Sequence, residues 1–133
     1  MKHHFRVTLA LAACMAALCG PAKADGLVII TNSALTLSAD DVRDVFLGDK
    51  QMSGTTKLVP IDNASAQDAF LASVVKLEAS KYTTVWTKKS FRDGLNPPSV
   101  KASDSEVIEF VKHTPGAVGY VKKAPASGVN VVK

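Results

Sequence analysis

Residues Trp86–Val121 read WTKKSFRDGLNPPSVKASDSEVIEFVKHTPGAVGYV, and this stretch carries the strongest fold signal in the chain. It begins with an aromatic segment, Trp-x4-Phe-x2-Gly, that leads into a loop with two consecutive prolines. Ser103 and Glu106 then form a capping box, a pattern that starts helices. The segment Pro115–Val121 stops this helix and continues as an apolar strand. A helix that leads directly into a buried strand is typical of α/β proteins.

Working outward from this stretch, the hydrophobic pattern predicts alternating strands and helices. Pro60 fits an edge position or a strand end better than the interior of a sheet. No repeat or linker divides the chain, so we predict one α/β domain with a small, mostly parallel sheet flanked by helices. The expected strands cover residues 27–30, 58–61, 118–121 and 129–132, the helices 37–46, 65–77, 80–89 and 103–114, and the loops 49–56 and 91–102.

The first 24 residues have the pattern of a signal peptide. Lys2 and Arg6 precede an apolar run, and Ala22-Lys23-Ala24 is a small-x-small cleavage site. The run is too short to span a bilayer, so we expect no membrane insertion after cleavage. The prediction is a periplasmic domain over residues 25–133. A lipid anchor on Cys14 is the alternative, because Leu11-Ala12-Ala13-Cys14 resembles a lipoprotein processing box.

Removal of the signal peptide changes the composition. Three of the 16 basic residues and none of the 12 acidic residues lie in it, so 13 basic and 12 acidic residues leave a net charge of +1. This balance argues against a nucleic-acid partner. Both cysteines, Cys14 and Cys19, are also removed. The domain must therefore be stabilised by burial of its core and not by disulfides.

The turn after the second strand is a candidate anion site. A helix N-terminus offers unpaired N–H groups and a partial positive charge. We expect Asn63, Ser65 and the backbone N–H groups of Ala66 and Gln67 to converge there. The simpler reading is that Ser65 only caps the helix, reinforced by Asp68.

Asn32 and Ser33 are the second part of the candidate site. They follow the first strand at its carboxyl end, where open α/β sheets bind ligands. An ordinary polar strand exit is the alternative. Trp86 and Phe91 are predicted to lie in the core rather than in a binding surface.

The sequence contains no pattern that is typical of a catalytic or metal-binding site. After cleavage the only histidine is His113, at a helix C-terminus, and no zinc, calcium or nucleophile-histidine-acid pattern can be assembled. We therefore predict that the protein is not an enzyme, and nothing in the sequence calls for a cofactor.

Several segments resemble the small single-domain family related to phosphate ABC transporter substrate-binding proteins. The resemblance covers nearly all of residues 27–132 and implies a periplasmic-binding-protein-like lobe. Its most specific part is Pro115–Val121, which is similar to the family's Pro-Gly-Ala-Ile-Gly-Tyr-Val element. It also rests on Leu37–Gly48, Lys57–Asp62, Phe70 and the Trp86, Phe91, Gly94 element.

The resemblance implies phosphate or another small oxyanion as ligand and an ABC permease or a sensor as partner. Two features depart from the full receptors. The chain has length for one lobe, and the turn Asp62–Asp68 lacks the arginine and glycines of their anion loop. The alternative function is therefore a ligand-free interaction module for an envelope protein or a second copy of the chain.

Overall fold

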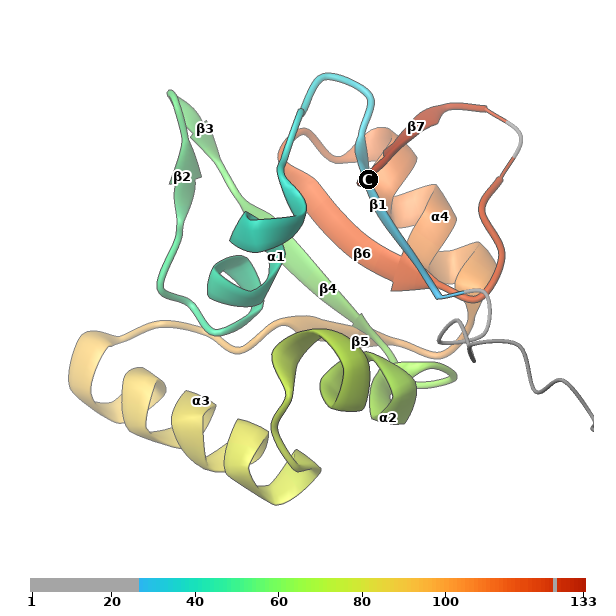
Figure 1. The fold of residues 1–133 in the computed structure, drawn as a ribbon. Helices are drawn as coiled ribbons and strands as arrows, with labels where there is room; N and C mark the ends of the chain where they lie inside the picture. Colours follow the sequence, from blue (N-terminus) through green and yellow to red (C-terminus); the bar gives the residue numbers. More distant parts are fainter. Residues whose placement is uncertain (1–26, 126) are drawn as a thin grey trace, which may run out of the picture.

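The computed structural model describes residues 27–125 and 127–133, so the predicted signal peptide lies outside the described residues. A five-stranded sheet with the order β5-β4-β6-β1-β7 forms its centre (Figure 1). Its strands are β1 Val28–Asn32, β4 Val59–Asn63, β5 Ser99–Lys101, β6 Ala117–Val121 and β7 Val129–Val131. The helices are α1 Ala39–Phe46, α2 Gln67–Phe70, α3 Ala79–Asp93 and α4 Asp104–His113.

Four of the five strands run in one direction. β4 is parallel to β5 and β6, whereas β1 is antiparallel to both of its neighbours, β6 and β7. The prediction of an α/β fold with a mostly parallel sheet flanked by helices is therefore confirmed. The reversed direction of β1 was not predicted, and it determines where its carboxyl end lies.

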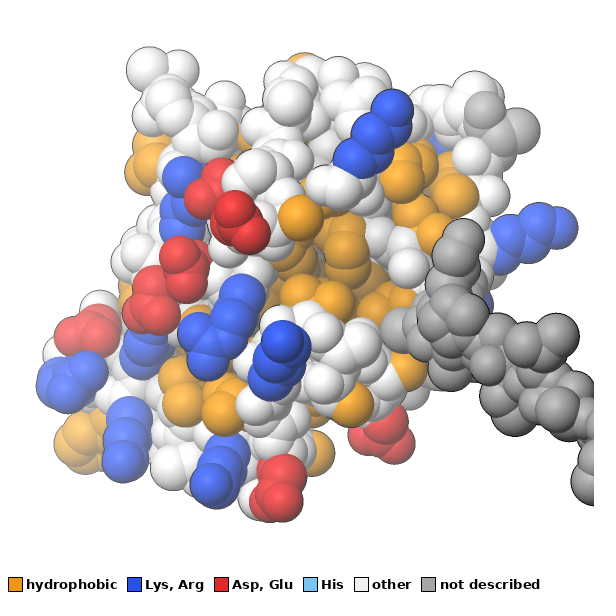
Figure 2. All heavy atoms as spheres, viewed as in Figure 1, with side chains coloured by type: hydrophobic (Ala, Val, Ile, Leu, Met, Phe, Trp, Pro, Cys, Tyr) orange, Lys and Arg blue, Asp and Glu red, His pale blue; other side chains and the backbone are white. Residues whose placement is uncertain are grey.

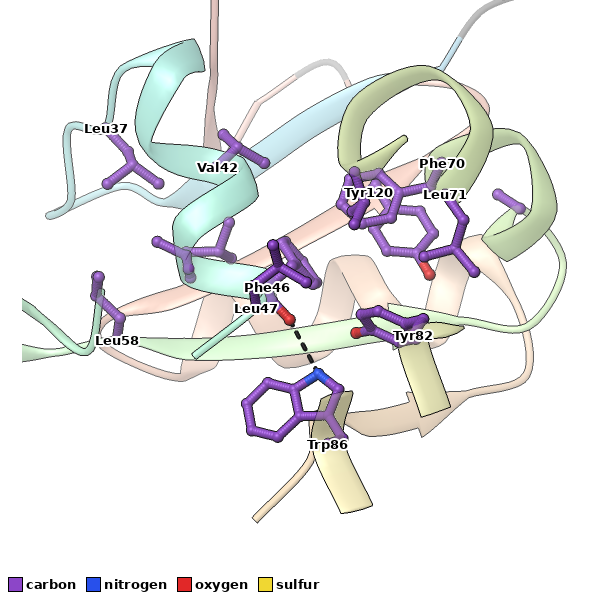
Figure 3. Packing of buried hydrophobic residues seen from close by; sticks show 14 of the residues in the cluster. Leu37, Val42, Phe46, Leu47, Leu58, Phe70, Leu71, Tyr82, Trp86 and Tyr120 are labelled. Carbon is purple, nitrogen blue, oxygen red and sulfur yellow. Dashed lines mark hydrogen bonds between the residues drawn. The ribbon is translucent and has the colours of Figure 1, made fainter. Parts of the chain in front are cut away.

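Side chains of β6 alternate between the two layers that cover the sheet, as the pleat requires. Tyr120 packs against α1 and α2 on one face, in contact with Phe46 and Phe70. The rings of Phe70 and Tyr120 are stacked with centroids 3.9 Å apart (Figure 3). Val121 on the other face joins the cluster formed by α4.

Serine side chains begin two of the helices. Ser38 caps α1 and accepts a hydrogen bond from the N–H of Asp41. Ser103 caps α4 in the same way through Glu106. Gly48 follows the end of α1 with a positive φ of 74°, as expected for a helix stop.

The segment after β4 begins differently from the prediction. Ser65 does not cap α2, because the helix starts at Gln67 and its N-cap residue is Ala66, without a side-chain cap. α2 continues as a π-helical turn, Leu71–Val75, which ends at Lys76 in the left-handed region.

Two predicted loops contain short strands. β2 Met52–Ser53 and β3 Thr56–Lys57 form a small hairpin within and beside the expected 49–56 loop. β5 lies within the expected 91–102 loop and pairs with β4. These strands are too short for a hydrophobic period to indicate them.

Pro60 lies near the beginning of β4, as the strand-end alternative predicted, although β4 is an interior strand of the sheet. Val59 donates its N–H to Gly116 on the β6 side, so the nitrogen of Pro60 points toward β5. β5 begins opposite Ile61, one residue further on. No residue of β5 lies opposite Pro60, so the sheet loses no hydrogen bond through the missing N–H of Pro60.

α3 lies at the periphery of the domain (Figure 1). Tyr82 and Trp86 are its buried residues, and the indole Nε1–H of Trp86 donates to the carbonyl of Phe46 (Figure 3). Lys and Arg side chains gather over α3 on the face shown in Figure 2. Trp86 is in the core as predicted, but Phe91 is 97% exposed, so its prediction as a core residue was wrong.

No helix of the described residues is long and apolar enough to cross a membrane.

Candidate functional site

Asn63 organises the turn after β4. Its side chain is fully buried at the end of the strand. The Oδ1 atom accepts hydrogen bonds from the N–H and the hydroxyl of Ser65, at 3.0 and 2.6 Å. The Nδ2 atom donates to the carbonyl of Tyr120 and to Asp104. Asn63 and Ser65 are thus brought together as predicted, but their hydrogen-bonding groups are used within the protein.

The carboxylate of Asp104, at the first residue of α4, occupies this turn. Its Oδ1 atom accepts a 2.7 Å hydrogen bond from Asn63 and lies 3.4 Å from the hydroxyl of Ser65. Its Oδ2 atom accepts the N–H of Lys122 at 2.9 Å. The Asn63 amide and the Lys122 N–H therefore donate to an oxyanion that the protein itself supplies. The Ser65 hydroxyl lies beside this oxyanion and donates its proton to Asn63. Asp104 was not predicted as part of the site, because it lies 41 residues from Asn63 in the chain.

Ala66 and Gln67 complete the turn. The N–H of Ala66 donates to the carbonyl of Asn63, so this group is already engaged. Gln67 is half-buried at the first position of α2, and it lines a groove together with Asp62. The expected set of converging backbone N–H groups is thus only partly formed.

Asn32 and Ser33 lie at the opposite end of the strands from Asn63. Thr31 pairs with Val118 at the beginning of β6, whereas Asn63 contacts Tyr120 near its end. The structure therefore does not bring Asn32 and Ser33 to the turn, because β1 runs against β4 and β6.

Asn32 has a structural role at that end. Its Nδ2 atom donates to the carbonyls of Val111 and Lys112 at the end of α4, and its Oδ1 atom accepts the N–H of Ala34. Its side chain thus links the C-terminus of α4 to β1. Ser33 is exposed, and its carbonyl accepts a hydrogen bond from Asn130.

Asp62 forms a second polar centre, next to the turn. Its carboxylate is 2% exposed and accepts hydrogen bonds from the hydroxyls of Tyr82 and Tyr120, at 2.9 and 2.8 Å. Burial raises the pKa of Asp62 above its ordinary value, and the two hydroxyls oppose this shift. Burial and the nearby carboxylate also raise the pKa of both tyrosines, which therefore remain donors.

A groove of about 600 Å³ opens beside this centre. It is bounded by α3, by the loop containing Pro97 and Pro98, and by β5. Its size is in the range of small-molecule sites. The lining residues are Asp62, Gln67, Tyr82, Thr83, Trp86, Thr87, Ser90, Phe91, Pro97, Pro98 and Val100.

In the described part of the chain, no group of three or more His, Cys, Asp or Glu side chains is placed to hold a metal ion.

Comparison with solved structures shows which fold this is. A phosphate ABC transporter substrate-binding protein from Clostridium perfringens, solved with bound phosphate, superposes with a TM-score of 0.63 at 16% identity, over 82% of this chain and 44% of that one. The chain has the fold of one lobe of a periplasmic binding protein. PstS from Borrelia burgdorferi (TM-score 0.53, 19% identity, 81% of this chain and 46% of that one) is also similar. So is a phosphate transport receptor from Vibrio cholerae (TM-score 0.50, 20% identity, 82% and 46%).

These similarities concern the fold, because the identities are low. The chain spans less than half the length of each of these structures. No protein-family profile and no curated protein matches the sequence. Two of the three structural neighbours are named as binding or transport proteins.

Proposed function

We propose that this chain is a periplasmic solute-binding domain that takes phosphate or another small oxyanion at the turn formed by Asn63, Ser65 and Lys122. The observation that supports this most strongly is that the Asn63 amide and the Lys122 N–H both donate to the Asp104 carboxylate, with the Ser65 hydroxyl beside it. A turn that binds one oxyanion has the chemistry to bind another. The fold is shared with phosphate receptors, which makes phosphate the first ligand to test.

Binding at this turn requires that the ligand displace Asp104. Each like charge at 4–6 Å costs on the order of 3–4 kcal/mol before screening, at an effective dielectric constant of 20. Asp62 lies one residue before Asn63 and adds a second carboxylate nearby. We therefore expect weak binding of phosphate by the unmodified protein.

Thermal unfolding at equal ionic strength tests this proposal. The protein is melted with phosphate, sulfate or chloride. A ligand present at about 100 times its Kd adds about 2.7 kcal/mol, and each 1 kcal/mol moves the midpoint by roughly 4–8 °C in a domain of this size. A higher midpoint in phosphate or sulfate than in chloride supports the proposal. Coincident midpoints in all three salts contradict it.

The proposal includes export and a partner. The N-terminal pattern of Lys2, Arg6 and Ala22-Lys23-Ala24 supports cleavage before Asp25 and a periplasmic location. An ABC permease or a sensor is the partner that the phosphate-receptor fold favours. Mass spectrometry of the exported protein distinguishes a chain that begins at Asp25 from one that carries a lipid on Cys14.

A ligand-free interaction module is the second candidate function. It is favoured by the same carboxylate, because Asp104 already satisfies the donors of the turn. In this case the protein would bind an envelope protein or its own copy, and no oxyanion would stabilise it. Sedimentation analysis, with and without phosphate, separates self-association from ligand binding.

A further inference from the structure

Asp62 carries a buried charge without a basic partner. Within the described residues, no lysine, arginine or histidine forms an ion pair with its carboxylate. Its hydrogen-bond donors are the hydroxyls of Tyr82 and Tyr120. Buried carboxylates are usually compensated by a cation or a metal ion, because two neutral donors replace only part of their hydration. The site therefore has a charge that a cationic ligand would complement.

One end of this centre faces the groove. Asp62 and Tyr82 both line the groove, whereas Tyr120 is fully buried and does not. Tyr82 donates to the Oδ2 atom and Tyr120 to the Oδ1 atom. The Oδ2 atom is therefore the carboxylate oxygen next to Tyr82, where Asp62 is 2% and Tyr82 5% exposed.

The hydroxyls along α3 make the groove rich in acceptors. Thr83 donates its hydroxyl proton to the carbonyl of Ala79, and Thr87 donates to that of Thr83. Tyr82 donates to Asp62. Each of these oxygens retains lone pairs but no free proton, so it can only accept a further hydrogen bond. These acceptors favour a ligand with several N–H donors, while Gln67 and Ser90, which also line the groove, can both donate and accept.

The apolar wall also suits a cation. Trp86 and Phe91 line the groove, with Val100 of β5 completing the wall. Phe91 and Val100 are both exposed and stand beside open solvent. Aromatic faces attract ammonium groups, most strongly when the cation is partly desolvated.

We propose that the groove between α3 and β5 binds a small organic ammonium ion. Its N–H groups donate to Asp62 and Tyr82, and its apolar part lies against Trp86 and Phe91. This site is separate from the oxyanion turn, so either one can fail without the other.

Trp86 is the only tryptophan in the sequence, so its fluorescence reports on the groove directly. The protein is titrated with cyclohexylammonium chloride, with cyclohexanol as the neutral analogue of the same shape, at constant ionic strength maintained by sodium chloride. A saturable change with the ammonium ion and none with the alcohol is the expected result. Equal responses to both compounds, or no saturable response, overturn the proposal.

Three variants locate the binding. Asp62→Asn retains the shape of the side chain and should weaken ammonium binding roughly tenfold or more. Asp93→Asn is the matched control, since Asp93 is an exposed carboxylate on α3 that does not line the groove, and its affinity should be unchanged. Phe91→Ala removes a side chain that is almost fully exposed, so it should fold normally and weaken binding roughly threefold.

Phe91→Ala keeps the proposal testable if Asp62→Asn fails to fold. Wild-type affinity in both Phe91→Ala and any folded Asp62→Asn protein would contradict the assigned site. The phosphate melting experiment has no bearing on this result, because it reports on the turn at Asn63 and Ser65.

Discussion

The side-chain amide of Asn63 donates a 2.7 Å hydrogen bond to the carboxylate of Asp104, 41 residues further along the chain. This contact joins the end of β4 to the start of α4 and places a negative charge on the turn that was predicted to receive an anion. Whether the turn can serve a ligand therefore depends on how easily Asp104 is displaced.

Replacement of Asp104 by alanine should open the turn. Removing the carboxylate frees the Asn63 amide and the Lys122 N–H as donors and eliminates a like charge. We expect phosphate affinity to rise roughly tenfold or more, measured as a larger difference between melting midpoints in phosphate and chloride.

Asp40→Ala is the matched control for this variant. Asp40 also lies in the first turn of a helix, α1, so its loss has a similar effect on the helix dipole without touching the turn. If phosphate raises the melting midpoint of both variants by the same amount, displacement of Asp104 does not explain the effect.

The hydroxyl of Tyr120 should contribute measurably to stability. Tyr120→Phe retains the ring that stacks on Phe70 but removes the 2.8 Å hydrogen bond to the Asp62 carboxylate. A hydrogen bond to a charged group contributes about 1.5–3 kcal/mol, so the free energy of unfolding in urea should fall by about that amount. In an Asp62→Asn background the same substitution should have a smaller effect, and an equal effect would show that the hydroxyl acts independently of the charge.

Burial of Asp62 should make stability depend on pH. The pKa of Asp62 is raised in the folded state above its ordinary value of 3.8, so the folded protein binds this proton more tightly than the unfolded chain. The contribution of Asp62 to stability is therefore greatest below 3.8 and is lost as pH rises through the folded pKa. Asp62→Asn lacks this dependence. Urea unfolding of both proteins across the acidic range measures the difference, and a wild-type protein that gains stability relative to Asp62→Asn with rising pH would contradict this sign.

Gly119 should tolerate no side chain, because α4 packs directly on β6 there. An added Cβ atom would lie 2.6 Å from Cγ1 of Val107, a stiff β-branched side chain. Gly119→Ala should therefore lower the free energy of unfolding by about 1–3 kcal/mol. In the double variant with Val107→Ala the total loss should be smaller than the sum of the two single losses. Strict additivity in chemical denaturation would show that this contact is not the cause.

Much of the local structure could be predicted from particular residues. Ser38 and Ser103 cap their helices because the hydroxyl and the helix N–H groups it serves lie within three residues. Ser65 has the same residue type in a similar context, yet its hydroxyl donates to Asn63 instead. The buried side chain of Asn63 is positioned by β6 and α4, and no local pattern contains that information.

The candidate site could be predicted only in part. Asn63 and Ser65 meet because they are neighbours in the chain, whereas Asn32 and Ser33 lie at the other end of the strands because β1 is antiparallel to β6. Periodicity indicates that a segment is a strand but not its direction within a sheet. Phe91 was predicted as a core residue of the 91–102 loop, whereas α3 continues to Asp93 and leaves Phe91 exposed, because its residue type does not tell which side of the helix it occupies.

The sequence by itself determined the α/β class, most helix and strand positions and the polar turn after β4, since these depend on spacing, capping and burial within short windows. The tertiary structure alone decided that Asp104 occupies the turn and that Tyr82 and Tyr120 converge on Asp62. Those contacts join residues 20 to 58 positions apart, and they form only after the sheet order and strand directions bring their elements together.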